Sequence, residues 1–187
     1  MRKLKLQMQI SADGYAAGPA GELDWLVWGW DETLKAHVSK QTENVDCILL
    51  GRKLADGFIP HWQSLQDNPD TADAFSDKMV NTPKIVFSAS TNPGDWKNTM
   101  VISSDAETFI RQLKSQPGKD IIVYGGCSFV SSLIDSGLID EFHLYMNPVA
   151  ISKGLSVFRK SSENIQLRLT QSISFSSGIV LLQYEPK

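Results

Sequence analysis

The chain has 187 residues, of which 42% are hydrophobic and 21% charged, and its formal net charge is −3 at pH 7. This length fits one domain with a sizeable core, and the charge argues against a generic nucleic-acid binder. No apolar stretch has the length of a membrane span, and the start of the chain lacks the apolar core of a signal peptide. The cysteines Cys47 and Cys127 lie far apart beside apolar runs, and we expect reduced thiols in a cytoplasmic protein.

Hydrophobic periodicity predicts strands that alternate with helices along most of the chain. The predicted strands cover residues 4–10, 45–50, 84–88, 100–102, 121–124 and 142–147, followed by a hairpin over 167–174 and 178–184. The predicted helices cover residues 32–43, 71–80, 105–114 and 128–136, a further helical turn opens at 51–53, and residues 58–69 are expected to be irregular. This order predicts an α/β fold with three layers, α-β-α, a mostly parallel central sheet and an antiparallel C-terminal hairpin.

A glycine pair follows the apolar strand at residues 121–124. Because Gly125 and Gly126 lack a Cβ atom, they allow a sharp turn and a close approach of another group to the backbone. The helix predicted after them directs its free N–H groups towards this turn, and such a helix start favours a phosphate. We therefore expect a phosphate-bearing cofactor here, with a tight strand–helix turn that binds nothing as the alternative.

Three further loops are expected at the same edge of the sheet, because ligands of parallel α/β sheets bind beyond the carboxyl ends of the strands. These loops cover residues 11–14, 51–53 and 88–90. Arg52 and Lys53 stand beside a glycine and are suited to hold a phosphate, although a solvated helix start is the alternative. The convergence of four loops favours a ligand site at this rim. The sequence has no G-x-G-x-x-G motif, which argues against an ordinary Rossmann cofactor site.

Tryptophan is dense between residues 25 and 30. Trp25, Trp28 and Trp30 form either a hydrophobic plug at one end of the core or an aromatic wall for a flat substrate ring. Cysteine and histidine are scattered and show no zinc-binding spacing, so we expect no metal site.

The order and spacing of these motifs resemble the dihydrofolate reductase-like family, and within it the reductase domain of bacterial riboflavin biosynthesis. The resemblance covers nearly the whole chain. It rests on the motifs SADG, ILLGRK, KIVFS, IIVYGG, LIDEF and NPV, at residues 11–14, 48–53, 84–88, 121–126, 138–142 and 147–149.

The resemblance implies a nicotinamide cofactor, NADPH or alternatively NADH. By analogy the glycine pair carries the pyrophosphate, often across a cis Gly–Gly peptide, and Ala12 lies against the nicotinamide. The expected cofactor-binding residues are Ala12, Gly51, Arg52, Lys53, Ser88, Ala89, Ser90, Tyr124, Gly125, Gly126, Cys127, Ser128 and Phe129. The candidate substrate-binding residues are Asp13, Trp28 and Trp30.

The chain departs from the family pattern at several positions. Ser88-Ala89-Ser90 stands where an arginine often grips the 2′-phosphate, so the choice between NADPH and NADH stays open. Tyr124 stands where the riboflavin-pathway reductases commonly carry a glutamate, which leaves the substrate open. Dihydrofolate-type enzymes place a carboxylate on the first helix, and Asp31 and Glu32 are the catalytic candidates here, with helix capping as the alternative.

The resemblance therefore predicts an NADPH-dependent reductase of a small heterocyclic substrate, similar to 5-amino-6-(5-phosphoribosylamino)uracil reductase, with a pterin as the second substrate candidate. A homodimer without nucleic-acid or membrane partners is expected. One alternative is a nucleotide-binding protein of the same fold without catalytic activity. Another is an apolar-ligand-binding protein built on the tryptophan cluster.

Overall fold

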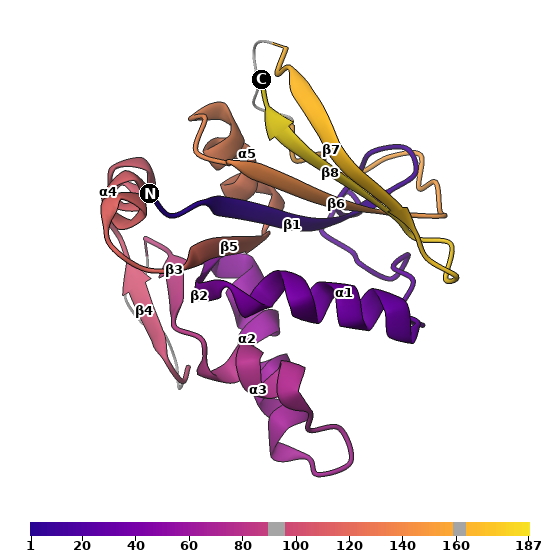
Figure 1. The fold of residues 1–187 in the computed structure, drawn as a ribbon, viewed down its shortest axis with the longest axis horizontal. Coiled ribbons are helices and arrows are strands. Elements are labelled where there is room, and N and C mark those ends of the chain that lie inside the picture. The colour runs from indigo at the N-terminus through magenta and orange to yellow at the C-terminus, as the bar shows by residue number, and fades with distance from the viewer. Residues whose placement is uncertain (90–95, 159–163) are drawn as a thin grey trace.

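The computed structural model describes residues 1–89, 96–158 and 164–187. An eight-stranded sheet in the order β4-β3-β2-β5-β1-β6-β8-β7 organises the chain (Figure 1). The first six strands in this order are parallel, and the last two attach to β6 as an antiparallel hairpin. The strands are β1 (Leu4–Ser11), β2 (Val45–Gly51), β3 (Lys84–Phe87), β4 (Thr99–Ile102), β5 (Asp120–Gly125), β6 (Glu141–Asn147), β7 (Leu167–Ser174) and β8 (Val180–Pro186). The α/β fold class predicted from the sequence is confirmed.

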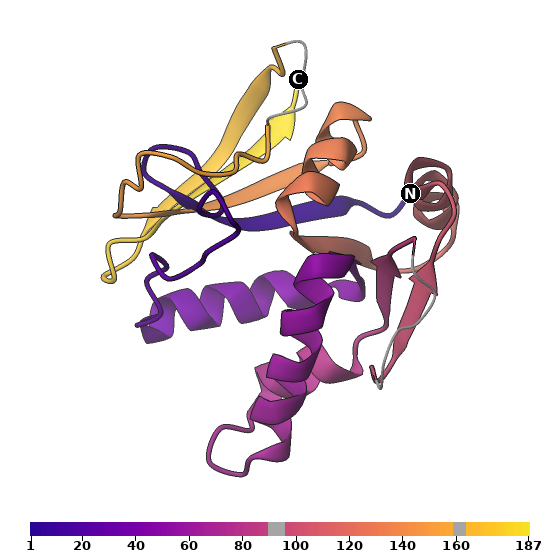
Figure 2. The same ribbon diagram turned by 180° about the vertical axis from the view of Figure 1, so that it is seen from behind.

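Helices cover both faces of this sheet, as expected for three layers. They are α1 (Glu32–Glu43), α2 (Arg52–Asp67), α3 (Ala74–Asn81), α4 (Ala106–Ser115) and α5 (Cys127–Asp135). In Figures 1 and 2, α5 lies above the sheet and α1, α2 and α3 lie below it. Among the described residues, no helix combines the length and the apolar character that a membrane crossing requires.

Each face of the sheet has its own apolar contacts. The even-numbered apolar residues of β1, among them Leu6, pack with Val130 and Leu133 of α5. On the opposite face, Ile48 of β2 packs with Ile59 of α2. Alternation along the strands thus gives both helix layers an apolar surface to bury, which is the main stabilising contribution to a fold of this kind.

Helix α2 is longer than the sequence indicated. The expectation of irregular structure over residues 58–69 is wrong, because α2 continues through Asp67 with Pro60 inside it. Proline removes one backbone hydrogen bond from a helix. Here the helix nevertheless buries Ile59, and the Trp62 ring meets Phe75 of α3 edge-on at 5.3 Å between centroids. We attribute the continued helix to this apolar burial, which outweighs the cost of the proline.

Candidate functional site at the carboxyl rim of the sheet

The carboxyl ends of β3, β2, β5 and β1 form one continuous rim, because these strands are neighbours and run parallel. The loops at residues 11–14, 51–53, 88–89 and 125–128 follow these strands directly. The predicted convergence of these loops is therefore confirmed. Ser90, one of the cofactor-binding residues that the family resemblance implies, lies outside the described residues.

The glycine pair forms the turn between β5 and α5. The peptide bond between Gly125 and Gly126 is cis, as the family resemblance implied. Gly125 has φ +139°, a backbone conformation that glycine adopts far more readily than other residues. A Cβ atom built on Gly126 would meet nothing within 4 Å. The space in front of the start of α5 is therefore open to another group.

The start of α2 lies directly beside the start of α5. A Cβ atom built on Gly51 would lie 3.2 Å from the backbone nitrogen of Gly126 and 3.0 Å from Cβ of Phe129. Strand β2 also pairs Leu50 with Gly125 in the sheet. Two helix N-termini, each with a partial positive charge, therefore meet at one point of the rim.

These two helices differ from the others in how they begin. Asp31, Asp73 and Asp105 cap α1, α3 and α4, and each carboxylate accepts a hydrogen bond from the backbone N–H group three residues later. The N-cap residues of α2 and α5 are Gly51 and Gly126, and neither makes a side-chain hydrogen bond to its helix. Their first N–H groups are thus suited to bind an anion, and a phosphate group matches this geometry.

Arg52 stands at the first position of α2 beside this point. Its guanidinium lies over the ring of Trp96 at 4.7 Å from the ring centroid, and it forms an ion pair with Asp56. The side chain of Lys53 is exposed. Near the start of α5, the ring of Phe129 stacks on Phe87 at the end of β3, with 5.1 Å between centroids. A cation and a set of aromatic rings therefore border the two helix starts.

Asp31 is fully occupied by structural hydrogen bonds, in agreement with the capping alternative. Its carboxylate accepts from the N–H group of Leu34 at 2.8 Å, from the hydroxyl of Thr33, and from Ser176 Oγ and Ser177 N of the β7–β8 turn. These bonds, that of Thr33 above all, hold the pKa of this carboxyl far below its usual range. A carboxylate with so low a pKa is a poor proton donor at neutral pH.

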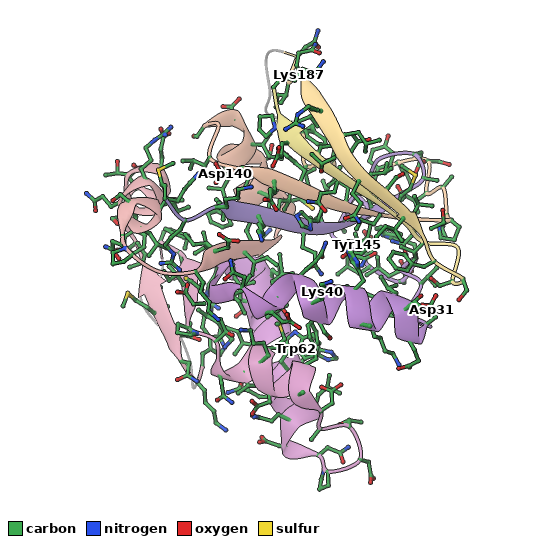
Figure 3. All side chains as sticks on the ribbon, viewed as in Figure 1. Asp31, Lys40, Trp62, Asp140, Tyr145 and Lys187 are labelled. Atoms are coloured by element: carbon green, nitrogen blue, oxygen red, sulfur yellow. The ribbon has the colours of Figure 1, made fainter. Side chains whose placement is uncertain are left out.

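Glu32 lies at the surface of the same helix. Its side chain is 89% exposed and pairs with Lys35 one turn further along α1. The geometry therefore gives both acidic residues structural or surface roles at the start of α1, which Figure 3 marks at Asp31.

We expect Asp31→Ala to lower the midpoint of thermal unfolding, Tm, by roughly 3 °C, because α1 loses its cap. The turnover number should stay within about twofold of the parent, because a positioned proton donor would contribute at least about a hundredfold. The measurements are thermal unfolding and a steady-state assay. Asp105→Ala, which removes the equivalent cap from α4, is the matched control. A large loss of turnover with unchanged Tm would show instead that Asp31 is catalytic.

The candidate substrate-binding residues make different kinds of contact in the structure. Asp13 accepts hydrogen bonds from Ser11 Oγ and from the backbone N–H groups of Ile151 and Ser152, and these bonds, led by that of Ser11, lower its pKa. It thus ties the loop after β1 to the segment after β6. The structure thus gives Asp13 a role in holding two loops together. The backbone N–H of Ala12 donates to Val149 in the same region.

Two members of the tryptophan cluster differ in burial. Trp30 is half-buried, donates from Nε1 to the carbonyl of Val27 at 3.0 Å, and packs on the core beneath α1. Trp28 is 69% exposed. Trp30 is thus part of a hydrophobic plug, whereas the Trp28 ring is available for contact with another molecule.

A buried polar layer between the sheet and α1 was missed in the sequence. Tyr145 donates to Gln41 Oε1 at 2.6 Å, Gln41 Nε2 lies 2.6 Å from His143 Nδ1, and His143 Nε2 lies 3.1 Å from a carboxylate oxygen of Glu141. The bond with His143, with help from Lys3, lowers the pKa of Glu141 to about 2. Polar alternation in β6 was the available signal, but the same alternation is typical of a solvent-facing strand.

No metal centre accompanies this site in the ranges that the structure describes, where no three histidine, cysteine, aspartate or glutamate side chains are grouped to hold an ion.

One family model and one protein of similar length match nearly the whole chain. The family model described as RibD C-terminal domain matches residues 2–181. The Uncharacterized protein YyaP of Bacillus subtilis (strain 168) is 32% identical over 186 residues, which cover 98% of this chain and 94% of that protein.

Two solved structures show the same fold at low identity. A diaminohydroxyphosphoribosylaminopyrimidine deaminase/5-amino-6-(5-phosphoribosylamino)uracil reductase from Thermotoga maritima superimposes with a TM-score of 0.69 and 18% identity, covering 100% of this chain and 57% of that chain. Dihydrofolate reductase from Enterococcus faecalis, complexed with NADP(H), superimposes with a TM-score of 0.60 and 12% identity, covering 99% of this chain and 96% of that chain. The fold is therefore dihydrofolate reductase-like.

Proposed function

Because the chain belongs to the RibD C-terminal domain family, we propose that it is a reductase that transfers hydride from NADPH or NADH to a small heterocyclic substrate. The observation that carries this proposal is the meeting of two helix starts at Gly51 and Gly126, with open space in front of Gly126. A dinucleotide carries a pyrophosphate, and this rim offers the positive ends of two helix dipoles to bind one.

The residues of the rim fit such a cofactor. The N–H groups at the starts of α2 and α5 would hold the pyrophosphate, and Arg52 would lie near the phosphates on the adenosine side. Ala12 would border the nicotinamide, since the loop after β1 reaches the same rim. The cofactor supplies the hydride. The chain's own contribution is to hold the two rings together in the correct orientation and to exclude water.

The titration of the protein with NADPH and, separately, NADH tests the cofactor site. We expect saturable binding that changes tryptophan fluorescence, because Trp96 contacts Arg52 beside the rim. The chain has Ser88-Ala89-Ser90 where the family often has an arginine for the 2′-phosphate, so that phosphate gains little from this loop. We therefore expect the two dissociation constants to differ by less than about tenfold. If neither dinucleotide binds, the proposal is wrong.

Hydride transfer is tested by cofactor oxidation, followed by absorbance. The first substrate to use is 5-amino-6-(5-phosphoribosylamino)uracil, which the Thermotoga maritima protein is named for reducing. The second is 7,8-dihydrofolate, after the Enterococcus faecalis enzyme. Oxidation that depends on either substrate supports a reductase. Tight dinucleotide binding without oxidation in the presence of any ring substrate would favour a nucleotide-binding protein without catalytic activity.

A further inference from the structure

A chain of three hydrogen bonds joins α1 to β6 through a histidine. The Tyr145 hydroxyl donates to Oε1 of Gln41 at 2.6 Å, Nε2 of Gln41 lies 2.6 Å from Nδ1 of His143, and Nε2 of His143 lies 3.1 Å from Oε2 of Glu141. Tyr145, which Figure 3 shows between β6 and α1, is 0% exposed, and His143 is 5% exposed. Bulk solvent therefore cannot replace a lost partner in this chain.

The donors and acceptors in this chain define the charge of His143. The bond with His143 lowers the pKa of Glu141 to about 2, so this carboxylate is ionised at neutral pH and only accepts. Nε2 of His143 therefore carries a hydrogen. The amide nitrogen of Gln41 only donates, so Nδ1 of His143 accepts and carries no hydrogen. In this arrangement the imidazole is neutral.

A proton taken up from solvent at Nδ1 of His143 would make both ring nitrogens donors. Nδ1 would then face the amide nitrogen of Gln41, which is also a donor, so the side-chain amide has to turn over and present Oε1 to the ring. Oε1 thereby leaves the Tyr145 hydroxyl, and the amide nitrogen donates to the hydroxyl oxygen instead. The hydrogen-bond chain thus has two arrangements, and the charge of His143 selects between them.

Charged groups on the neighbouring elements act on His143 in opposite directions. Glu141 favours the positive imidazole, whereas Lys3 and Lys5, which pair with Glu141, oppose it. His37 lies one turn before Gln41 on α1, and burial lowers the pKa of His37, so it stays neutral while His143 takes up a proton. Further titratable groups near this layer are Asp120 and Tyr124 of β5, Tyr145 of β6, Glu185 of β8 and Lys40 of α1. The bond at Nδ1 therefore decides between these opposing effects.

We propose that His143, Gln41 and Tyr145 form a pH-sensitive clasp between the sheet and α1. While His143 is neutral, the hydrogen bond from the Tyr145 hydroxyl stabilises the docked helix. When His143 takes up a proton, the Gln41 amide is reversed, the hydroxyl hydrogen loses its acceptor, and this contribution is lost. The clasp acts on the C-terminal half of α1 and does not depend on which ligand the rim binds. Asp31, whose pKa lies far below its usual range, keeps the start of α1 in place.

Nitrogen-15 NMR of the imidazole rings tests the two arrangements, because it distinguishes protonated from unprotonated ring nitrogens and the chain has only three histidines. In the parent at about pH 8, His143 should carry a hydrogen on Nε2 and none on Nδ1. Gln41→Glu replaces the amide by a group that only accepts, and the midpoint of the His143 titration should rise by at least about one pH unit. Tyr145→Phe removes the donor that holds Oε1 of Gln41, and the same midpoint should rise by roughly half a unit to one unit.

Thermal unfolding gives a second readout with a matched pair of tyrosines. At about pH 8, Tyr145→Phe should lower Tm by roughly 3 °C, because it removes a buried hydroxyl that donates to Gln41. At about pH 5 the parent has already released this hydroxyl, so the variant should unfold at the Tm of the parent or above it. Tyr124→Phe is the control, because the Tyr124 hydroxyl is buried and has no hydrogen-bond partner among the described residues. Its difference in Tm from the parent should be the same at both pH values.

Three results would overturn the inference. A hydrogen on Nδ1 of His143 in the parent at about pH 8 would show that Oε1 of Gln41 already faces the ring. An unchanged His143 titration in Tyr145→Phe would show that Gln41 does not couple the ring to the hydroxyl. An equal loss of Tm in Tyr145→Phe at both pH values would show that the hydroxyl keeps its acceptor after His143 is protonated. If Gln41→Glu does not fold, Tyr145→Phe still provides both measurements.

Discussion

Gly126→Val should abolish dinucleotide binding and leave the protein folded. We expect the NADPH dissociation constant to rise at least about a hundredfold, because the branched side chain would occupy the space that the pyrophosphate needs. The folded chain itself tolerates the substitution. Gly126 has φ −72°, and a Cβ atom there would meet no heavy atom within 4 Å. Fluorescence titration measures the binding, and thermal unfolding should give a Tm within about 2 °C of the parent.

Gly57→Val is the matched control for this experiment. A Cβ atom on Gly57 also meets nothing within 4 Å, and Gly57 lies inside α2, beyond its first turn. Its variant should bind NADPH as the parent does. If Gly126→Val also binds NADPH with the affinity of the parent, the phosphate site is not at the start of α5, and the main argument for a nicotinamide cofactor is lost.

The rim could be predicted from the sequence because its position follows from general properties of the chain. Alternation of strands and helices predicts parallel strands, and parallel strands bring their carboxyl ends to one edge. Gly51, Gly125 and Gly126 stand at the carboxyl ends of β2 and β5. The sharp turn between β5 and α5, and the room for a ligand beside it, could therefore be predicted. That a Cβ atom on Gly51 would come within 3.2 Å of the Gly126 nitrogen was not predictable, because this closeness depends on the packing of two helices that are far apart along the chain.

Local sequence was misleading where tertiary packing determines the length of a helix or the role of a side chain. Pro60 suggested an interruption, yet α2 continues because its apolar side faces β2 and α3. Acidic residues at the start of α1 suggested proton donation as well as capping. The choice for Asp31 depended on Ser176 and Ser177, which approach it from the distant β7–β8 turn.

The burial of the polar layer beneath α1 also depends on tertiary packing and could not be predicted from local sequence. Gln7 occupies a polar position in an alternating strand, a pattern typical of one solvated face. In the structure it is 7% exposed, because α1 covers that face. Its unpaired amide oxygen can be recognised only after the register with Tyr124 and His143 is known. The burial of Gln7 was therefore invisible to motif reasoning, whereas the cofactor rim was not.

Gly51→Val should destabilise the protein, in contrast to the same substitution at Gly126. The new Cβ atom would lie 3.0 Å from Cβ of Phe129 and 3.2 Å from the Gly126 nitrogen, and the two further methyl groups increase the overlap. Overpacking of a buried site of this kind costs about 2–3 kcal/mol of the free energy of unfolding. For a chain of this size we expect Tm to fall by roughly 6–10 °C.

Gly51→Val should also weaken NADPH binding, because the side chain forces the starts of α2 and α5 apart and their N–H groups then no longer converge on one phosphate. Binding is measured below the lowered Tm, so that the folded variant is compared with the folded parent. The two valine variants thus separate two uses of glycine at one site: room for a ligand at 126 and contact between two helix starts at 51. Equal loss of stability in both would show that the space before Gly126 is filled by protein. Full stability of Gly51→Val would show that the two helix starts do not touch, and the double N-terminus would no longer explain phosphate binding.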